Sequence, residues 1–146
     1  MADVTPIKKL LVANRGEIAR RIMRTAHDMG ISTVAIFAEG DARAPFVKEA
    51  DTAIFLEGRT STETYLDVEK VINACKRSGA DAVHPGYGFL SENEGFAQAI
   101  IDAGIKWIGP SPEVIGLMGD KLSAKNLMTE AGVPTLPAIE ITDKLD

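Results

Sequence analysis

The stretch Lys9-Leu-Leu-Val-Ala-Asn-Arg-Gly-Glu-Ile-Ala19 passes from the pattern of a buried strand into that of a helix. Residues 9–13 are mostly apolar, and the short polar turn Asn14-Arg-Gly-Glu17 follows them. After the turn, apolar residues recur at helical spacing, at Ile18, Ile22, Ala26 and Met29. A strand that leads directly into a helix is the unit from which parallel sheets are built, so we expect an α/β fold.

Short apolar runs and longer helical stretches continue to alternate along the rest of the chain. Strands are expected at residues 9–13, 33–37, 53–56, 82–84 and 106–108. Helices are expected over about residues 17–29 and 63–77, with more after the fourth and fifth strands. This order predicts an open, mainly parallel five-stranded sheet with helices on both faces.

Capping residues set the expected starts of the later helices. Ser91-Glu-Asn-Glu94 has the form of a capping box, in which a hydroxyl and a carboxylate satisfy free backbone donors. Ser111-Pro112 has the form of an N-cap followed by proline at the first helical position. Asp120 is expected to cap one more helix, which would run to about Ala131.

The chain is expected to form one domain over residues 1–133. Gly132 and Pro134 would end its last helix. The tail 134–146 alternates apolar residues with no later element to pack against. We interpret this tail as the start of a linker into a further domain that the sequence lacks.

Composition and charge exclude several classes of protein. The chain has 146 residues, of which 45% are hydrophobic and 25% are charged, as in ordinary globular domains. Its formal net charge of -5 argues against nucleic acid or an anionic membrane as a partner. It begins without the apolar segment of a secretory signal, and no apolar run approaches the ~20 residues that span a bilayer. A cytoplasmic protein is expected, and the single Cys75, predicted to be buried on a helix, agrees with a reducing compartment.

Two turns after predicted strands are candidate sites. Asn14-Arg-Gly-Glu17 has one glycine instead of the three of a dinucleotide-binding fingerprint, which disfavours NAD and favours a tight turn. In Pro85-Gly-Tyr-Gly88 the two glycines allow a ligand to approach the backbone; alternatively, they only make the turn while Tyr87 covers the sheet edge. His84, directly before this loop, is expected to be a hydrogen-bonded structural residue.

Charged residues on helices offer two more candidates. Lys121 lies at the start of a predicted helix, where a lysine is favoured only if an anion shares the site; otherwise it is a solvated surface residue. Arg20, Arg21 and Arg24 with Asp28 form a charged face that is either solvated or a subunit contact. Two histidines and one cysteine do not suggest a metal site.

Four motifs together resemble the biotin carboxylase family, in the family's order and spacing, from about residue 7 to 137. They are Lys9-Leu-Leu-Val-Ala-Asn-Arg-Gly-Glu-Ile-Ala19, His84-Pro-Gly-Tyr-Gly-Phe-Leu-Ser-Glu-Asn93, Trp107-Ile-Gly-Pro-Ser111 and Met118-Gly-Asp-Lys121. The resemblance is greatest to acyl-CoA carboxylase α subunits, with pyruvate carboxylase next. One departure is Phe46-Val47, where the family often has a histidine before the valine at the start of a short helix.

The resemblance implies a Rossmann-like domain preceding an ATP-grasp domain in an enzyme that uses Mg-ATP and bicarbonate to carboxylate biotin. It implies that Lys121 contacts ATP phosphate, and that Tyr87 and Gly88 border the biotin and carboxyphosphate site. It also implies dimerisation through one face of the first helix, at Arg21, Arg24 and Asp28.

The resemblance further implies the partners of the domain. These are an ATP-grasp domain, a biotin carrier domain and a carboxyltransferase subunit, and the magnesium ligands lie downstream. No catalytic residue is expected within this chain, which should be inactive alone. The alternative is a stand-alone dimerisation or nucleotide-binding module.

Overall fold

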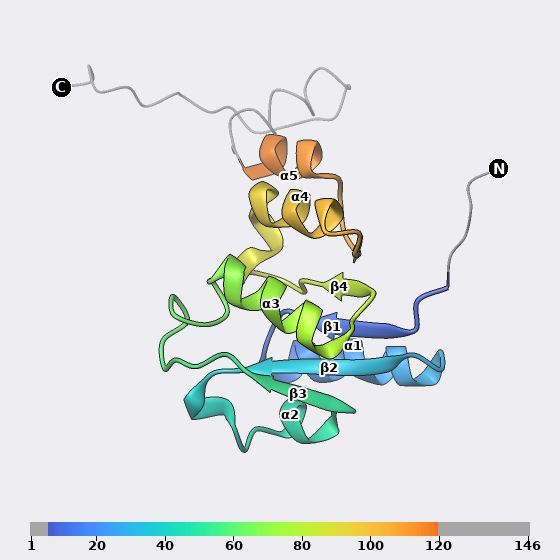
Figure 1. The fold of residues 1–146 in the computed structure, drawn as a ribbon, viewed down its shortest axis with the longest axis vertical. Helices are drawn as coiled ribbons and strands as arrows, with labels where there is room; N and C mark the ends of the chain where they lie inside the picture. Colours follow the sequence, from blue (N-terminus) through green and yellow to red (C-terminus); the bar gives the residue numbers. More distant parts are fainter. Residues whose placement is uncertain (1–5, 120–146) are drawn as a thin grey trace, which may run out of the picture.

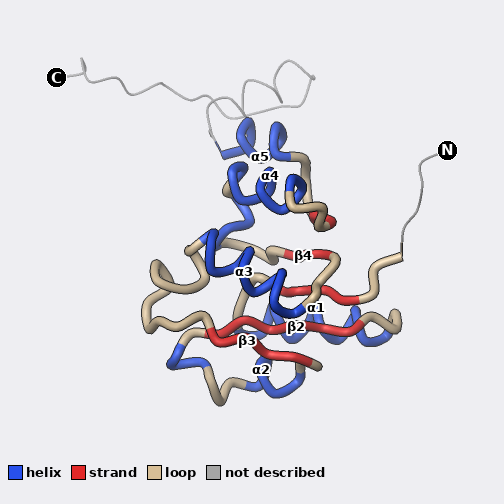
Figure 2. Tube along the Cα trace, in the orientation of Figure 1, coloured by secondary structure: helices blue, strands red, loops and turns tan. Residues whose placement is uncertain are grey.

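A computed structural model describes residues 6–119 of the chain and contains one five-stranded sheet. Its strands are β1 (Lys9–Val12), β2 (Ser32–Phe37), β3 (Thr52–Phe55), β4 (Ala82–His84) and β5 (Lys106–Trp107). They lie in the order β3-β2-β1-β4-β5, and every neighbouring pair is parallel (Figures 1 and 2). The predicted five-stranded sheet is confirmed, and it is parallel throughout.

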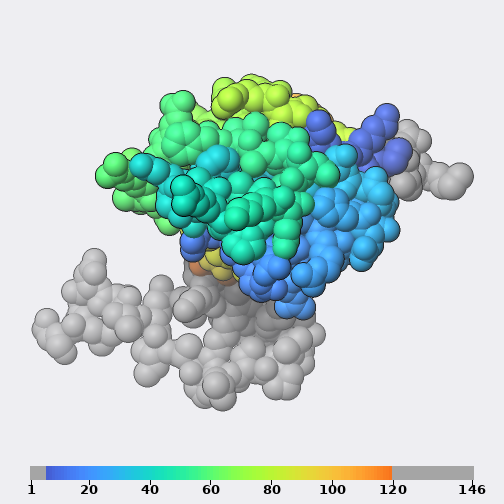
Figure 3. Space-filling view, turned by 90° about the horizontal axis from the view of Figure 1, so that it is seen from below, coloured from blue at the N-terminus to red at the C-terminus, as the bar shows by residue number. Residues whose placement is uncertain are grey.

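Helices cover both faces of this sheet, as predicted. The helices are α1 (Gly16–Asp28), α2 (Pro45–Glu49), α3 (Val68–Ser78), α4 (Glu94–Asp102) and α5 (Pro112–Gly119), with short 3-10 turns η1 (Glu39–Asp41) and η2 (Phe89–Glu92). Leu10 and Val12 of β1 pack with α1 and α2, whereas Leu11 packs with α3 and α4 on the other face. Figure 1 shows α3 in front of the sheet and α1 behind it, and Figure 3 shows the segment of α2 beside that of α1.

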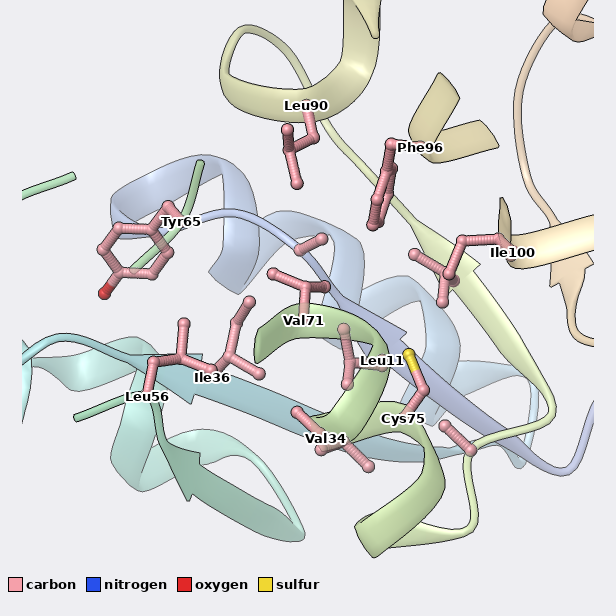
Figure 4. Packing of buried hydrophobic residues seen from close by; sticks show 14 of the residues in the cluster. Leu11, Val34, Ile36, Leu56, Tyr65, Val71, Cys75, Leu90, Phe96 and Ile100 are labelled. Atoms are coloured by element: carbon pink, nitrogen blue, oxygen red, sulfur yellow. The ribbon is translucent and has the colours of Figure 1, made fainter. Parts of the chain in front are cut away.

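The larger core lies between the sheet and helices α3 and α4 (Figure 4). Its labelled members include Leu11, Val34, Val71, Cys75, Phe96 and Ile100, all of them almost completely buried. Burial raises the pKa of the Cys75 thiol to about 12. Cys75 is therefore a neutral packing residue, as its helical register predicted.

Helix α1 packs against the sheet through a different face from the predicted one. Its buried residues are Ala19, Met23 and Ala26. Ile18 and Ile22 are only half-buried, and Met29 is 69% exposed, so the predicted face is wrong except at Ala26. The two alanines let the helix lie close to the sheet, and the bulkier apolar side chains beside them stay accessible.

The start of α3 was predicted five residues too early. The helix begins at Val68, and the Asp67 carboxylate caps it by accepting a hydrogen bond of 3.0 Å from the backbone N–H of Lys70. Tyr65 lies before the helix in a turn and is buried, with its hydroxyl accepting a hydrogen bond from the N–H of Ala38. This long-range contact holds the chain out of the helical path that local periodicity favoured.

The predicted cap at Ser91 is also wrong. Ser91 lies within η2, and the side chain of Asn93 caps α4 by accepting 2.9 Å from the N–H of Phe96. The Ser111 cap is confirmed, because its hydroxyl accepts 3.3 Å from the N–H of Val114, and Pro112 opens α5. Among the described residues, no helix is long and apolar enough to cross a membrane.

Two further expectations concern short or distal segments. The short helix α2 was expected only from the family resemblance, and Phe46, at the position where the family often has histidine, is buried against α1 and the sheet. The helix expected after Asp120, with Lys121 at its start, and the tail 134–146 lie outside the described residues.

Candidate functional site

The strand order reverses between β1 and β4, and the candidate site lies at this switch point. From β1 the chain proceeds to β2 and β3 on one side, and from β4 it proceeds to β5 on the other. The connecting helices α1 and α4 lie on opposite faces of the sheet, which leaves a crevice beyond the carboxyl ends of the two strands. The polar turn after β1 and the glycine loop after β4 therefore meet there.

Asn14 fills this crevice and joins the two loops. Its side chain is buried, and its amide nitrogen donates to the carbonyl oxygens of Pro85 at 2.9 Å and Tyr87 at 2.6 Å. Its amide oxygen accepts 2.8 Å from the N–H of Arg15. Both ends of the amide are thus engaged.

The glycine loop approaches Asn14 too closely for any larger residue. Gly86 has φ +66°, and a Cβ built on it would lie 2.6 Å from the amide nitrogen of Asn14. Gly88 also has a positive φ, +67°, as does Phe89 at 45°. These three left-handed or unusual conformations turn the chain sharply away from the sheet.

Tyr87 projects from the top of this turn into solvent. Its side chain is 83% exposed, so it does not cover the sheet edge, which was the structural alternative for this loop. A phenol ring held out on a rigid backbone offers an aromatic face and one hydroxyl to a ligand. Tyr87 and Gly88, the two residues predicted to border a biotin site, therefore lie on an accessible loop.

His84 supports the loop from beneath. Its Nδ1 accepts a hydrogen bond of 3.0 Å from the N–H of Gly86, which requires an unprotonated Nδ1. Partial burial lowers the pKa of the His84 imidazole below its usual value. His84 is a structural residue, as predicted from the sequence.

We expect the loop to loosen in acid because His84 must then accept a proton on Nδ1. The unfolded-state pKa of histidine is about 6.5 and the folded value lies lower, so the stabilisation is complete above that pH and declines as pH falls through the folded pKa. An NMR titration should show the His84 ring and the Gly86 amide inflecting together below pH 6.5. The Gly86 inflection should vanish in H84Q, and an inflection at or above pH 6.5 would contradict the assignment.

An apolar groove of about 660 Å³ runs from the loop along α1. Its lining includes Ile7, Ile18, Ile22, Met29, Ile31, Tyr87 and Ile108, together with the charged Glu17 and Arg21. The groove thus explains where the unburied apolar side chains of α1 point. An exposed apolar surface of this kind is typical of a contact with another part of a larger protein.

The charged face of α1 divides into two parts. Arg20 is held within the domain by Glu49 of α2, at 2.8 Å, and by Glu17, at 3.1 Å. By contrast, Arg21, Arg24 and Asp28 are exposed, and none of them forms a salt bridge within residues 6–119. These three side chains lie on one face of the helix and are available to a partner.

The cation that follows Asn14 in the sequence is already paired. Arg15 forms a bidentate ion pair with Asp41, at 2.7 and 2.6 Å, and the hydroxyl of Tyr65 donates to the same carboxylate at 2.6 Å. Arg15 and, more weakly, Tyr65 hold the pKa of Asp41 below its usual value. Arg15 is thus committed to Asp41.

Two features of the site bear on what the sequence predicted. Asn14 was interpreted as part of a plain turn, and only its position after a strand, at the same sheet end as the glycine loop, could have indicated its role. The described residues contain no group of His, Cys, Asp and Glu suited to a metal ion. Lys121 lies outside the described residues, so its relation to the site is not described.

Comparison with protein families and known proteins gives consistent matches. The family described as biotin carboxylase, N-terminal domain, matches residues 6–115, which include both loops of the site. The biotin-dependent acyl-coenzyme A carboxylase alpha3 subunit of Mycobacterium leprae is 55% identical over 131 residues, covering 90% of this chain and 22% of that protein. The mitochondrial pyruvate carboxylase of Mus musculus is 48% identical over 139 residues, covering 94% of this chain and 12% of that protein.

A solved structure has the same fold. It is the biotin carboxylase domain dimer of the Hydrogenobacter thermophilus 2-oxoglutarate carboxylase, in complex with MgADP, ADP and bicarbonate. The match has a TM-score of 0.86 at 49% identity and covers 92% of this chain and 29% of that one. The chain therefore spans less than a third of the length of each of these three proteins.

Proposed function

Because the chain belongs to the biotin carboxylase N-terminal domain family, we propose that it is the first domain of a biotin-dependent carboxylase. The complete enzyme would use Mg-ATP and bicarbonate to form carboxyphosphate and ADP, and would then transfer the carboxyl group to a ureido nitrogen of biotin with release of phosphate. The observation that best supports this role is the exposed Tyr87 on a loop fixed at the switch point.

In this proposal the domain contributes binding surface and leaves the phosphoryl chemistry to other parts of the enzyme. Tyr87 and Gly88 would border biotin and carboxyphosphate, and Lys121 would contact ATP phosphate. Magnesium would neutralise the phosphate charge that develops during transfer. The described residues 6–119 hold no cluster fit to bind that ion, so its ligands are proposed to lie in the downstream ATP-grasp domain.

We propose that residues 1–133 form the domain and that 134–146 lead into the ATP-grasp domain. The apolar groove along α1 would then be covered by the rest of the carboxylase, and this contact would bury the exposed parts of Ile18 and Ile22. A biotin carrier domain and a carboxyltransferase would complete the enzyme. The cytoplasmic location expected from the sequence stays a prediction.

Measuring bicarbonate- and biotin-dependent ADP release tests the proposal. The longer protein that carries this domain and its downstream sequence should release ADP only when both bicarbonate and biotin are present. The 146-residue chain, assayed beside it, should release none, because one phosphate contact without metal or further cations gives little stabilisation of a phosphoryl transition state. Folded longer protein that is silent at saturating Mg-ATP would overturn the assignment.

A dimer through α1 is the second candidate role, and Arg21, Arg24 and Asp28, which form no salt bridge within residues 6–119, favour it. Reversing the charge of a desolvated arginine at an interface places like charges together or leaves a carboxylate unpaired. We expect R24E to raise the dimer dissociation constant by about tenfold or more, measured by sedimentation velocity over a range of concentrations.

R77E provides the matched control for this interface, since Arg77 is exposed on α3, on the opposite face of the sheet. It should leave the dissociation constant unchanged. Equal behaviour of R24E and the wild type, or a wild type that stays monomeric at every concentration, would remove the dimerisation proposal while leaving the carboxylase proposal in place.

We further propose an acyl-CoA as the final carboxyl acceptor, in fatty acid metabolism. The support is the 55% identity to the acyl-coenzyme A carboxylase subunit of M. leprae, against 48% for the pyruvate carboxylase of M. musculus. Incorporation of labelled bicarbonate into acetyl-CoA or propionyl-CoA, compared with pyruvate, by the complete enzyme tests this choice. Preferential carboxylation of pyruvate would contradict it.

A further inference from the structure

The buried amide of Asn14 is the only side chain among the described residues that hydrogen bonds both sides of the Gly86 turn. Its two acceptors, the carbonyls of Pro85 and Tyr87, lie directly before and after Gly86. Its own oxygen is fixed by the N–H of Arg15, so the side chain is anchored to the β1–α1 turn. We propose that Asn14 is a positioning residue that sets the orientation of Tyr87 toward biotin, an inference that rests on the proposed function.

The side chain of Tyr87 has little else to hold it. It is 83% exposed, so packing against the domain does not fix the ring, and its direction follows from the backbone of residues 85–88. Gly86 and Gly88 adopt positive φ without a Cβ that would clash, but Phe89, directly after this segment, holds a strained conformation with φ 45°. Such conformations persist only where surrounding contacts over-determine them, and the two bonds from Asn14 are contacts of that kind.

An amide is the side chain that this position requires. Two carbonyl oxygens face its nitrogen and a backbone N–H faces its oxygen, so the orientation of the amide is fixed by its partners. A carboxylate of the same shape would place an oxygen against both carbonyls. An alanine would leave both carbonyls without this donor in the crevice.

The N14D and N14A variants of the carboxylase that contains this domain test the inference. N14D keeps the volume and removes the donor, whereas N14A removes both. For each we expect the KM for free biotin to rise about tenfold or more while the KM for ATP stays within about twofold, because only the biotin-facing loop is displaced. N73D and N73A, at an exposed asparagine on α3, are matched controls that should change neither constant.

Two outcomes would overturn the positioning role. If the maximal rate falls only in proportion to the amount of folded enzyme, and both KM values are unchanged, Asn14 only stabilises the fold. Wild-type behaviour of N14D would show that its volume suffices and its donor does not matter. Absence of biotin-dependent ADP release in the wild type would contradict the proposed function instead.

A second measurement tests the positioning role of Asn14 independently of the proposed carboxylase function. Hydrogen exchange of the 146-residue chain should be accelerated about tenfold or more in N14D at residues 84–89, with the strands of the sheet unaffected. Unchanged exchange at this loop would refute the positioning of Tyr87 by Asn14, independently of any assay with biotin.

Discussion

Replacing Gly86 by alanine is expected to destabilise the chain by about 2–5 kcal/mol and to abolish carboxylation of biotin. The left-handed φ of +66° costs a residue with a Cβ about 1–2 kcal/mol. The added Cβ would also lie 2.6 Å from the amide nitrogen of Asn14, so the loop must move and lose buried hydrogen bonds worth about 1–3 kcal/mol. Urea denaturation of the chain, and biotin-dependent ADP release by the complete enzyme, measure the two effects.

The matched control for G86A is G79A. Gly79 has a similar φ of +73°, at the end of α3, but nothing lies within 4 Å of a Cβ built there. It should cost only about 1–2 kcal/mol, from the backbone conformation alone, and should leave biotin kinetics intact. If both variants lose equal stability and the G86A enzyme still carboxylates biotin normally, the close approach between the two loops does not contribute to function.

The turn after β1 and the glycine loop after β4 show how the domain differs from a nucleotide-binding doubly wound fold. In such folds the crevice at the strand reversal is the usual ligand site. Here Asn14 occupies the crevice, and the adjacent Arg15 is committed to Asp41. The groups that a ligand or partner can reach therefore lie outside the crevice, at Tyr87 and in the groove beside α1. The domain uses its switch point to anchor a loop, and that loop presents the exposed Tyr87.

Strand positions were the part of the fold that the sequence predicted best. The apolar runs of β1, β2 and β4 are short and mostly buried, so their pattern has few alternatives, whereas β3 and β5 are only partly buried. Helix boundaries were predicted less well. The chain before α3 is held in a turn by the buried hydroxyl of Tyr65, and the cap of α4 is Asn93 instead of Ser91. Contacts over long sequence separations decided the first of these, and local patterns do not contain them.

The candidate site was predicted in part. The glycine loop stood out because two glycines followed a strand, but its partner Asn14 lies 71 residues before Pro85. Nothing local to Asn14 distinguishes a crevice-filling amide from a solvated one, since both follow a strand and precede a helix. The face of α1 was wrong for a related reason. Its apolar stripe is wider than the sheet covers, and periodicity alone does not tell Ile22, in the groove, from Met23, in the core.

The largest expected loss of stability follows replacement of Phe96 by alanine. Phe96 is completely buried in the core between the sheet and α4, and its ring meets that of Trp107 edge-on, with centroids 5.6 Å apart. Removing a buried phenyl ring costs about 3–5 kcal/mol, through lost transfer energy and the cavity left behind. Most domains have only about 5–15 kcal/mol in total, so F96A should be near the limit of folding.

Trp107 is the only tryptophan in the chain, so its fluorescence reports on this site directly. In F96A its emission should shift and the urea midpoint should fall, whereas I101A, on the same helix but 43% exposed, should change the free energy of unfolding by less than about 1 kcal/mol. Because α4 follows the Tyr87 loop through η2, loosening the helix should also accelerate hydrogen exchange at residues 85–92. An F96A chain with wild-type stability would mean that α4 is not anchored to the sheet by this core, and that the loop is held by Asn14 and His84 alone.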